Sequence, residues 1–140
     1  METKETDTTG LSIQDIIGQA RKIVIKIGSN TLAKADGKIN LDFMQSFADQ
    51  CAQLMKNGKQ IVLVSSGAQV AGVSTLDRWS RKKDIHYRQA LCAIGQVELM
   101  DKWRSVFTQN ELHIGQILLT KDDFEDDHRT LNMRNTLFTL

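Results

Sequence analysis

The sequence predicts an α/β fold on a mainly parallel sheet, because three segments repeat one arrangement. Each is a short apolar run followed by a small polar turn and then a helical pattern of apolar residues. The runs with their turns cover residues 23–30, 61–72 and 113–123. Strands that alternate with helices in this way are typical of parallel sheets covered by helices. Ligands of such sheets bind outside the carboxyl ends of the strands, so a site for a small anion is expected at these turns.

The composition limits the class of protein. The chain has 140 residues, 41% hydrophobic and 25% charged, which is the size and balance of one globular domain. The formal net charge of +1 gives no long-range field, so nucleic acid and membrane surfaces are poor candidates for partners. No apolar run approaches the roughly 20 residues of a membrane helix, and the polar start of the chain has no secretory pattern. The sequence therefore predicts a cytoplasmic protein, with Cys51 and Cys92 as reduced thiols.

The first 20 residues are predicted to precede the main domain, which would span residues 21–140. Residues 1–10 are polar and indicate a tail. A short helix is expected next, begun by Ser12 with Asp15 three residues later. Its apolar side chains are expected to face inward: Ile16, Ile17 and Ala20.

The first strand is predicted at Lys22–Ile27. Its nearly continuous β-branched run predicts cover on both faces of the sheet. A polar loop with a turn at Asp36 and Gly37 is expected over residues 32–39. Asn40 is predicted to begin a helix that ends at residues 57–58, where Asn-Gly favours a left-handed cap.

The second strand is predicted over residues 60–64, with a turn at 65–67 and a helix from about Ala68. Residues 76–84 are a basic stretch expected to be a solvated loop. A long helix is predicted over 87–109, a third strand over 113–119 and a last helix from about 130 to 140. The inner face expected for the long helix consists of Ala90, Ala93, Ile94, Val97, Met100, Trp103 and Phe107.

Lys26 and Gly28 stand at the end of the first strand. A glycine lets backbone N–H groups approach a phosphate, and a lysine ammonium supplies a compensating charge. The alternative is a strand-end lysine that points into solvent. A lysine flanked by Ile25 and Ile27 would otherwise have to be tolerated inside a core. Both interpretations remain open on the local sequence.

Ser65, Ser66, Gly67 and Ala68 connect the second strand to a helix. Free N–H groups and the positive end of the helix dipole favour an anion there, such as a carboxylate. The alternative is a serine-capped helix with no ligand. Neither G-x-x-x-x-G-K-[ST] nor G-x-G-x-x-G occurs in the chain, so a bound nucleotide would need another design.

No metal site is predicted. The acidic residues near the end of the chain lack the glycine and the spacing of an EF-hand loop, and they are interpreted as helix-dipole partners and solvated surface. They are Asp122, Asp123, Glu125, Asp126 and Asp127, with His128 beside them. His86 and His113 are isolated and are interpreted as structural.

Four segments together resemble the amino acid kinase family, and within it the glutamate 5-kinases. They are I-V-I-K-I-G-S-N at 23–30, S-S-G-A-Q-V-A-G at 65–72, R-Q-A-L-C-A-I-G-Q at 88–96 and H-I-G-Q-I-L-L-T at 113–120. The last two separate this group from the carbamate, aspartate, acetylglutamate and uridylate kinases. The resemblance covers about residues 22–140 and implies a three-layer αβα sandwich on a mainly parallel sheet.

The resemblance also implies an activity. These enzymes phosphorylate the side-chain carboxylate of L-glutamate with ATP and Mg²⁺, giving glutamyl 5-phosphate in the first step toward proline. A homo-oligomer and inhibition by proline are implied by the same analogy.

Residue roles follow by the resemblance alone. Lys26 would contact the ATP phosphates and stabilise charge on the transferring phosphoryl group, with Gly28 and Ser29 as a backbone cradle. The glutamate would be held by Ser66, Gly67 and Ala68. Two departures affect the pocket: Asn30 completes a Ser-Asn pair where Thr-Ser is usual, and Gln69 stands where an aliphatic residue or alanine is usual.

The resemblance implies that the chain holds a truncated, substrate-side half of the site. The family's further glutamate contacts, a catalytic aspartate, a second lysine and the adenine pocket fall beyond Leu140, so the chain alone is expected to be inactive. Two rival hypotheses remain: another enzyme of the same family, or a non-catalytic module that binds glutamate or proline.

Overall fold

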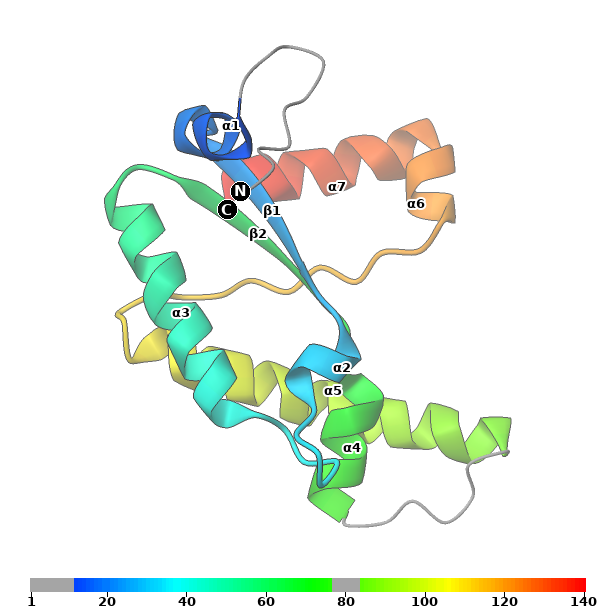
Figure 1. Cartoon of the computed structure of the whole chain (residues 1–140). Helices are drawn as coiled ribbons and strands as arrows, with labels where there is room; N and C mark the ends of the chain where they lie inside the picture. Colours follow the sequence, from blue (N-terminus) through cyan, green and yellow to red (C-terminus); the bar gives the residue numbers. More distant parts are fainter. Residues whose placement is uncertain (1–11, 77–83) are drawn as a thin grey trace.

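The computed structural model describes residues 12–76 and 84–140, and it has the α/β architecture that the sequence predicts (Figure 1). In the described residues, strands β1 (Lys22–Ile27) and β2 (Gln60–Ser65) form a parallel sheet with helices on both sides. The helices are α1 (Ile13–Gln19), α2 (Ser29–Leu32), α3 (Leu41–Lys56), α4 (Ala68–Leu76), α5 (Ile85–Thr108), α6 (Asp122–Glu125) and α7 (Asp127–Thr139). The predicted tail and most of the predicted basic loop lie outside the described residues.

Helix α1 begins as predicted but faces solvent. Ser12 and Asp15 form a capping box, in which each side chain accepts from the other's backbone N–H. Ile16 and Ile17 are 37% and 52% exposed, so the prediction that they turn inward is wrong. The helix is held at its other end, where the Lys59 ammonium donates to the carbonyls of Gly18 and Ala20. A cation at a helix C-terminus is favourable because the last carbonyls carry partial negative charge.

The β1–β2 sheet is packed on one face. Lys22 pairs with Gln60 and Ile27 pairs with Ser65. Every second residue of β1, counted back from Ile27, faces α3 and α5. Val24 lies on the other face and is 68% exposed. The predicted cover of both faces is therefore wrong for the described chain. Helix α7 lies on the open side, where the Lys22 ammonium sits 4.2 Å from the ring centre of Phe138 (Figure 1).

The connection from β1 to α3 is more structured than predicted. The short helix α2 places Leu32 in the core, fully buried. The predicted turn at Asp36 and Gly37 is confirmed, and Gly37 has a φ of 80°. The Asn40 side chain accepts from the Phe43 N–H and begins α3 as predicted. At the end of α3, Asn57 is the C-cap and Gly58 has a φ of 78°, also as predicted.

Helices α4 and α5 pack in very close contact through two glycines. A Cβ atom on Gly95 would collide with the backbone of Ala68 and Gly72, and one on Gly72 would collide with the Leu91 carbonyl. Only glycine permits the two backbones to approach so closely.

The buried face of α5 differs from the predicted one. Its buried residues are Leu91, Gly95, Leu99, Trp103, Val106 and Phe107. Ala90, Ala93, Ile94 and Val97 were expected inside and are exposed. Apolar residues occur all around this helix, so periodicity alone could not choose the face; the two glycines decide it by fixing where α4 lies.

The third predicted strand is not formed. Residues 113–119 follow the left-handed residue Glu111 (φ 60°) and have no ladder partner in the described chain. This segment leads from the end of α5 to α6 and α7 (Figure 1). A strand exists only through hydrogen bonds to a neighbour, and an apolar run without one stays irregular. Helix α7 is present, and it starts three residues before the predicted position.

Both cysteines are free, as predicted. Cys51 lies in the core, and burial raises the pKa of its thiol to about 11, so the thiol stays neutral. Among the residues described, no helix is both long and apolar enough to span a membrane.

The α4–α5 contact generates a stability prediction. Gly95→Ala should lower the free energy of unfolding by about 1–3 kcal/mol or more, because the added methyl group meets backbone that cannot move independently of its helix. Denaturation in urea followed by circular dichroism measures the change.

The matched control is Gly18→Ala in α1, where a Cβ would meet no atom within 4 Å. This variant should be neutral or stabilising by up to about 1 kcal/mol, because alanine is the better helix former. Equal stabilities for the two variants would contradict the close α4–α5 approach.

Candidate functional site

The end of β1 presents an exposed lysine and an open backbone. The Lys26 side chain lies on the open face of the sheet, and it forms no salt bridge with any residue in 12–76 or 84–140. Gly28 begins α2 at φ −78°, and a Cβ there would meet no atom within 4 Å. The chain's own packing therefore does not require glycine at this position. The exposed Lys26 side chain fits both interpretations of the sequence, a solvated strand-end lysine and an ammonium that binds an anion.

Ser66 joins the two strand ends. Its backbone N–H donates to the Ile27 carbonyl at 3.0 Å, and its hydroxyl donates to the same carbonyl at 3.2 Å. The turn after β2 is thus tied to the residue that follows Lys26. Because the hydroxyl hydrogen is engaged, Ser66 must rotate to donate to a carboxylate, whereas its oxygen already offers lone pairs to a donor.

Gly67 adopts a conformation that favours glycine. Its φ is 123°, and a Cβ would lie 2.9 Å from Cδ1 of the buried Leu32. The turn after β2 therefore rests directly on α2, which follows β1. Leu32 couples the Gly28–Ser29 segment to the Ser66–Ala68 turn, and sequence analysis did not find it as a site residue.

Helix α4 offers free N–H groups at its start. The Ala71 N–H donates to the Gly67 carbonyl, which marks the first helical hydrogen bond. The N–H groups of the first turn have no acceptor within a helix, and the dipole gives this end a partial positive charge. Ala68 lies in that first turn. The carbonyl of Ala68 faces Gly95, so the α4–α5 packing fixes where these N–H groups lie.

The structure brings all six predicted site residues to one end of the sheet. The register places Lys26 beside Val64 and Ile27 beside Ser65, so both strand ends meet at the same edge. Lys26, Gly28 and Ser29 come from one connection, and Ser66, Gly67 and Ala68 from the other. This end combines an ammonium, open backbone and a helix N-terminus, and such a combination favours phosphate or carboxylate.

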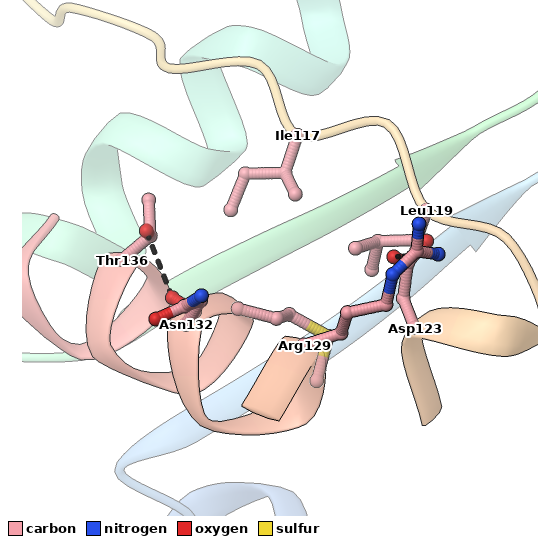
Figure 2. A pocket seen from close by; sticks show the side chains of 7 residues that line it. Ile117, Leu119, Asp123, Arg129, Asn132 and Thr136 are labelled. Carbon is pink, nitrogen blue, oxygen red and sulfur yellow. Dashed lines mark hydrogen bonds and ion pairs between the residues drawn. The ribbon is translucent and has the colours of Figure 1, made fainter. Parts of the chain in front are cut away.

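A separate pocket of about 250 Å³ lies between residues 117–119 and helices α6 and α7 (Figure 2). It contains none of the six predicted site residues. The charged pair in its lining, Asp123 and Arg129, is 3.3 Å apart. Asp123 also accepts from the backbone N–H and hydroxyl of Thr120. Those hydrogen bonds lower the pKa of Asp123 below its ordinary value, so this carboxylate stays ionised and fixes the start of α6.

The acidic residues lie at the N-termini of α6 and α7, where the sequence predicts helix-dipole partners. Asp126 accepts from the Arg129 N–H at 2.8 Å and begins α7. Asp122, Asp123 and Glu125 lie in the first turn of α6. Within the described part of the chain, no group of three or more histidine, cysteine or acidic side chains is arranged to hold a metal ion.

Comparison with known protein families identifies the family of this chain. The sequence profile of the amino acid kinase family matches residues 21–140. The chain belongs to the amino acid kinase family. The match covers β1, β2 and the helices that support the turns after them, so the family assignment includes the whole candidate site.

Among curated proteins, the chain is similar to several glutamate 5-kinases. It is 56% identical to that of Alkaliphilus oremlandii and 58% identical to that of Alkaliphilus metalliredigens, each over 128 residues and 91% of this chain. It is 46% identical to the glutamate 5-kinase of Treponema pallidum over 142 residues and 89% of this chain. The chain spans about half the length of these relatives, 48–49% of each.

Proposed function

We propose that the chain carries the substrate-side half of a glutamate 5-kinase site, which phosphorylates the side-chain carboxylate of L-glutamate with ATP. The observation that carries the proposal is the β1–β2 register, because it brings Lys26 and the Ser66–Ala68 turn to one edge of the sheet. The names of relatives that are 46–58% identical support this substrate over those of other kinases in the family.

In the proposed reaction, a side-chain carboxylate oxygen of glutamate forms a bond to the γ-phosphorus of ATP. The bond from that phosphorus to the bridging oxygen breaks, and the products are glutamyl 5-phosphate and ADP. Phosphoryl transfer depends mainly on positioning and on neutralising charge. The ammonium of Lys26 is assigned to the phosphate oxygens, with the open backbone of Gly28 and Ser29 beside it.

The other substrate is assigned to the turn after β2. The free N–H groups at the start of α4 hold a carboxylate of glutamate, and the Ser66 hydroxyl contacts the same substrate. Gly67 permits the positive φ of this turn and leaves room for the buried Leu32 behind it. A substrate held on these groups lies at the edge of the sheet near Lys26, the next-to-last residue of β1, which is the placement an in-line transfer needs.

The remaining parts of the proposal come from the family alone. Mg²⁺ neutralises phosphate charge in such reactions, and we assign it no residue of this chain. A cytoplasmic location, a homo-oligomer and inhibition by proline are proposed on the same analogy. The activity tests below use a completed chain, in which Leu140 is followed by the remaining half of the Alkaliphilus oremlandii glutamate 5-kinase.

Lys26→Ala in the completed chain should lower kcat by about 10²-fold or more. A fixed charge on a developing oxyanion is typically worth about 3 kcal/mol, and this exposed lysine contributes little to packing. Steady-state kinetics at saturating ATP and glutamate measure the change. The control is Lys22→Ala, on the same face at the other end of β1, which should keep kcat. A kcat near the unsubstituted value for Lys26→Ala would remove this lysine from the site.

Ser66→Ala should raise the KM for glutamate more than the KM for ATP, because glutamate is the only one of the two substrates that the lost hydroxyl is proposed to contact. Titrating each substrate at saturation of the other separates the two effects. The control is Ser105→Ala, an exposed serine on α5 far along the chain from both turns. Equal shifts in both KM values would contradict the assignment of this turn to glutamate.

The 140-residue chain by itself should show no glutamate-dependent ATP turnover, whereas the completed chain should show it. The chain supplies groups for one side of the transfer, and its sheet exposes Val24 and Val64 on an open face. The same face should bind a hydrophobic dye or lead to self-association. Turnover by the short chain, or a cooperative melt without dye binding, would show that it is complete in itself.

The completed chain also decides between the rival functions. Turnover with carbamate or acetylglutamate in place of glutamate would favour another enzyme of the family. Calorimetric binding of glutamate or proline without turnover would favour a non-catalytic module.

A further inference from the structure

Trp103 lies in the core directly behind the turn that follows β2. It belongs to α5, is 2% exposed, and packs against the rings of Phe47 and Phe107 at centroid distances of 5.8 and 5.9 Å. Its indole N–H donates to the Ser65 hydroxyl at 3.1 Å. A buried indole N–H needs an acceptor. Here the acceptor is the last residue of β2, next to Ser66.

The Ser65 hydroxyl also forms a hydrogen bond within the turn. It donates to the carbonyl of Ser66 at 3.1 Å. A serine hydroxyl has one hydrogen and two lone pairs, and it rotates to suit its partners. Because Trp103 donates to one lone pair, the hydroxyl hydrogen is directed to the Ser66 carbonyl. Trp103, Ser65 and the Ser66 carbonyl form a chain of two hydrogen bonds, which we call the Trp103 relay.

The relay determines the direction of one N–H group. The Ser66 carbonyl and the Gly67 N–H belong to the same trans peptide, so they point in opposite directions. With the carbonyl held toward Ser65, the Gly67 N–H is directed away from that hydroxyl. It donates to none of the residues that the structure describes. Gly67 at φ 123° has unusual backbone freedom, so an external contact that fixes this peptide has a large effect on its orientation.

We propose that Trp103 is a positioning residue for the substrate turn: through Ser65 it orients the Gly67 N–H toward the glutamate carboxylate. This inference rests on the proposed function of the turn. Trp103 itself touches no substrate. The alternative is a core tryptophan whose N–H is merely satisfied, and such a residue would affect stability without affecting recognition of one substrate.

The decisive variant is Trp103→Phe in the completed chain, because it keeps an aromatic ring and removes the donor. The KM for glutamate should rise about three- to tenfold, the value of one neutral hydrogen bond, while kcat and the KM for ATP stay within about twofold. Ser65→Ala should act in the same direction. The double variant should be no worse than Ser65→Ala alone, because both changes break one relay. Ser65→Thr keeps the hydroxyl and should restore the KM.

The matched control is Phe107→Leu, a change in the same aromatic cluster that removes no hydrogen bond. It should lower the melting temperature and leave both KM values unchanged. If Trp103→Phe behaves like Phe107→Leu, or if the effects of Trp103→Phe and Ser65→Ala add, the relay does not position the turn.

A measurement without turnover separates this inference from the proposed function. In ¹⁵N NMR spectra of the completed chain, Trp103→Phe should shift the Gly67 amide resonance, and Phe107→Leu should leave it in place. A shifted Gly67 resonance in a completed chain that neither binds nor phosphorylates glutamate would overturn the proposed function and its substrate. The relay itself would be retained. An unmoved resonance would overturn the relay whatever the activity.

Discussion

Parallel pairing between β1 and β2 brings together two turns that lie 39 residues apart in the sequence. The pairs run from Lys22–Gln60 to Ile27–Ser65, and the Ser66 N–H and hydroxyl extend the contact by bonding the Ile27 carbonyl. Without this register, Lys26 and the start of α4 would have no fixed position relative to each other. A shift of one residue would move Lys26 to the packed face and bury an ammonium among apolar side chains. The one-sided packing of the sheet therefore specifies the register that forms the site.

The packed side of the sheet supports the turn after β2 from several directions. Leu32 of α2 contacts Gly67, and the backbone of α5 contacts that of α4 at Gly72 and Gly95. Trp103 reaches the same turn by a hydrogen bond to Ser65. A turn containing a glycine at positive φ loses more conformational entropy on ordering than other turns, and the packed core offsets that cost. The turn after β2 thus has a conformationally free sequence, and the packed core behind it fixes its position.

The two faces of the sheet differ in how completely they are packed. Helices α3 and α5 bury one face, whereas Val24 and Val64 remain 68% and 49% exposed on the other. Helix α7 lies on that side and contains no buried residue, and its Phe138 is largely exposed. The relatives are about twice as long as this chain. An apolar run such as 113–119 becomes a strand only when a neighbour accepts and donates its hydrogen bonds, and the described chain provides none.

Local patterns determined much of this protein. The capping box at Ser12, the Asn40 cap, the left-handed Gly58 and the strand Lys22–Ile27 follow from short-range chemistry, and all were predicted. The six candidate site residues were also predicted from the sequence, with their roles taken from the family resemblance. The structure brings them to one edge of the sheet, and their roles stay a prediction.

Tertiary structure decided the rest, because those features depend on contacts between distant residues. Which face of α5 is buried depends on how close α4 can approach, and the glycines at 72 and 95 give no hydrophobic signal. The side of the sheet on which Lys26 lies follows from which face the core occupies, and a β-branched strand does not encode that choice. The bond from Trp103 to Ser65 spans 38 residues, so only the folded chain reveals it. Sequence thus determined the first two strands and most of the helices, whereas packing determined their orientation and left residues 113–119 without a strand partner in the described chain.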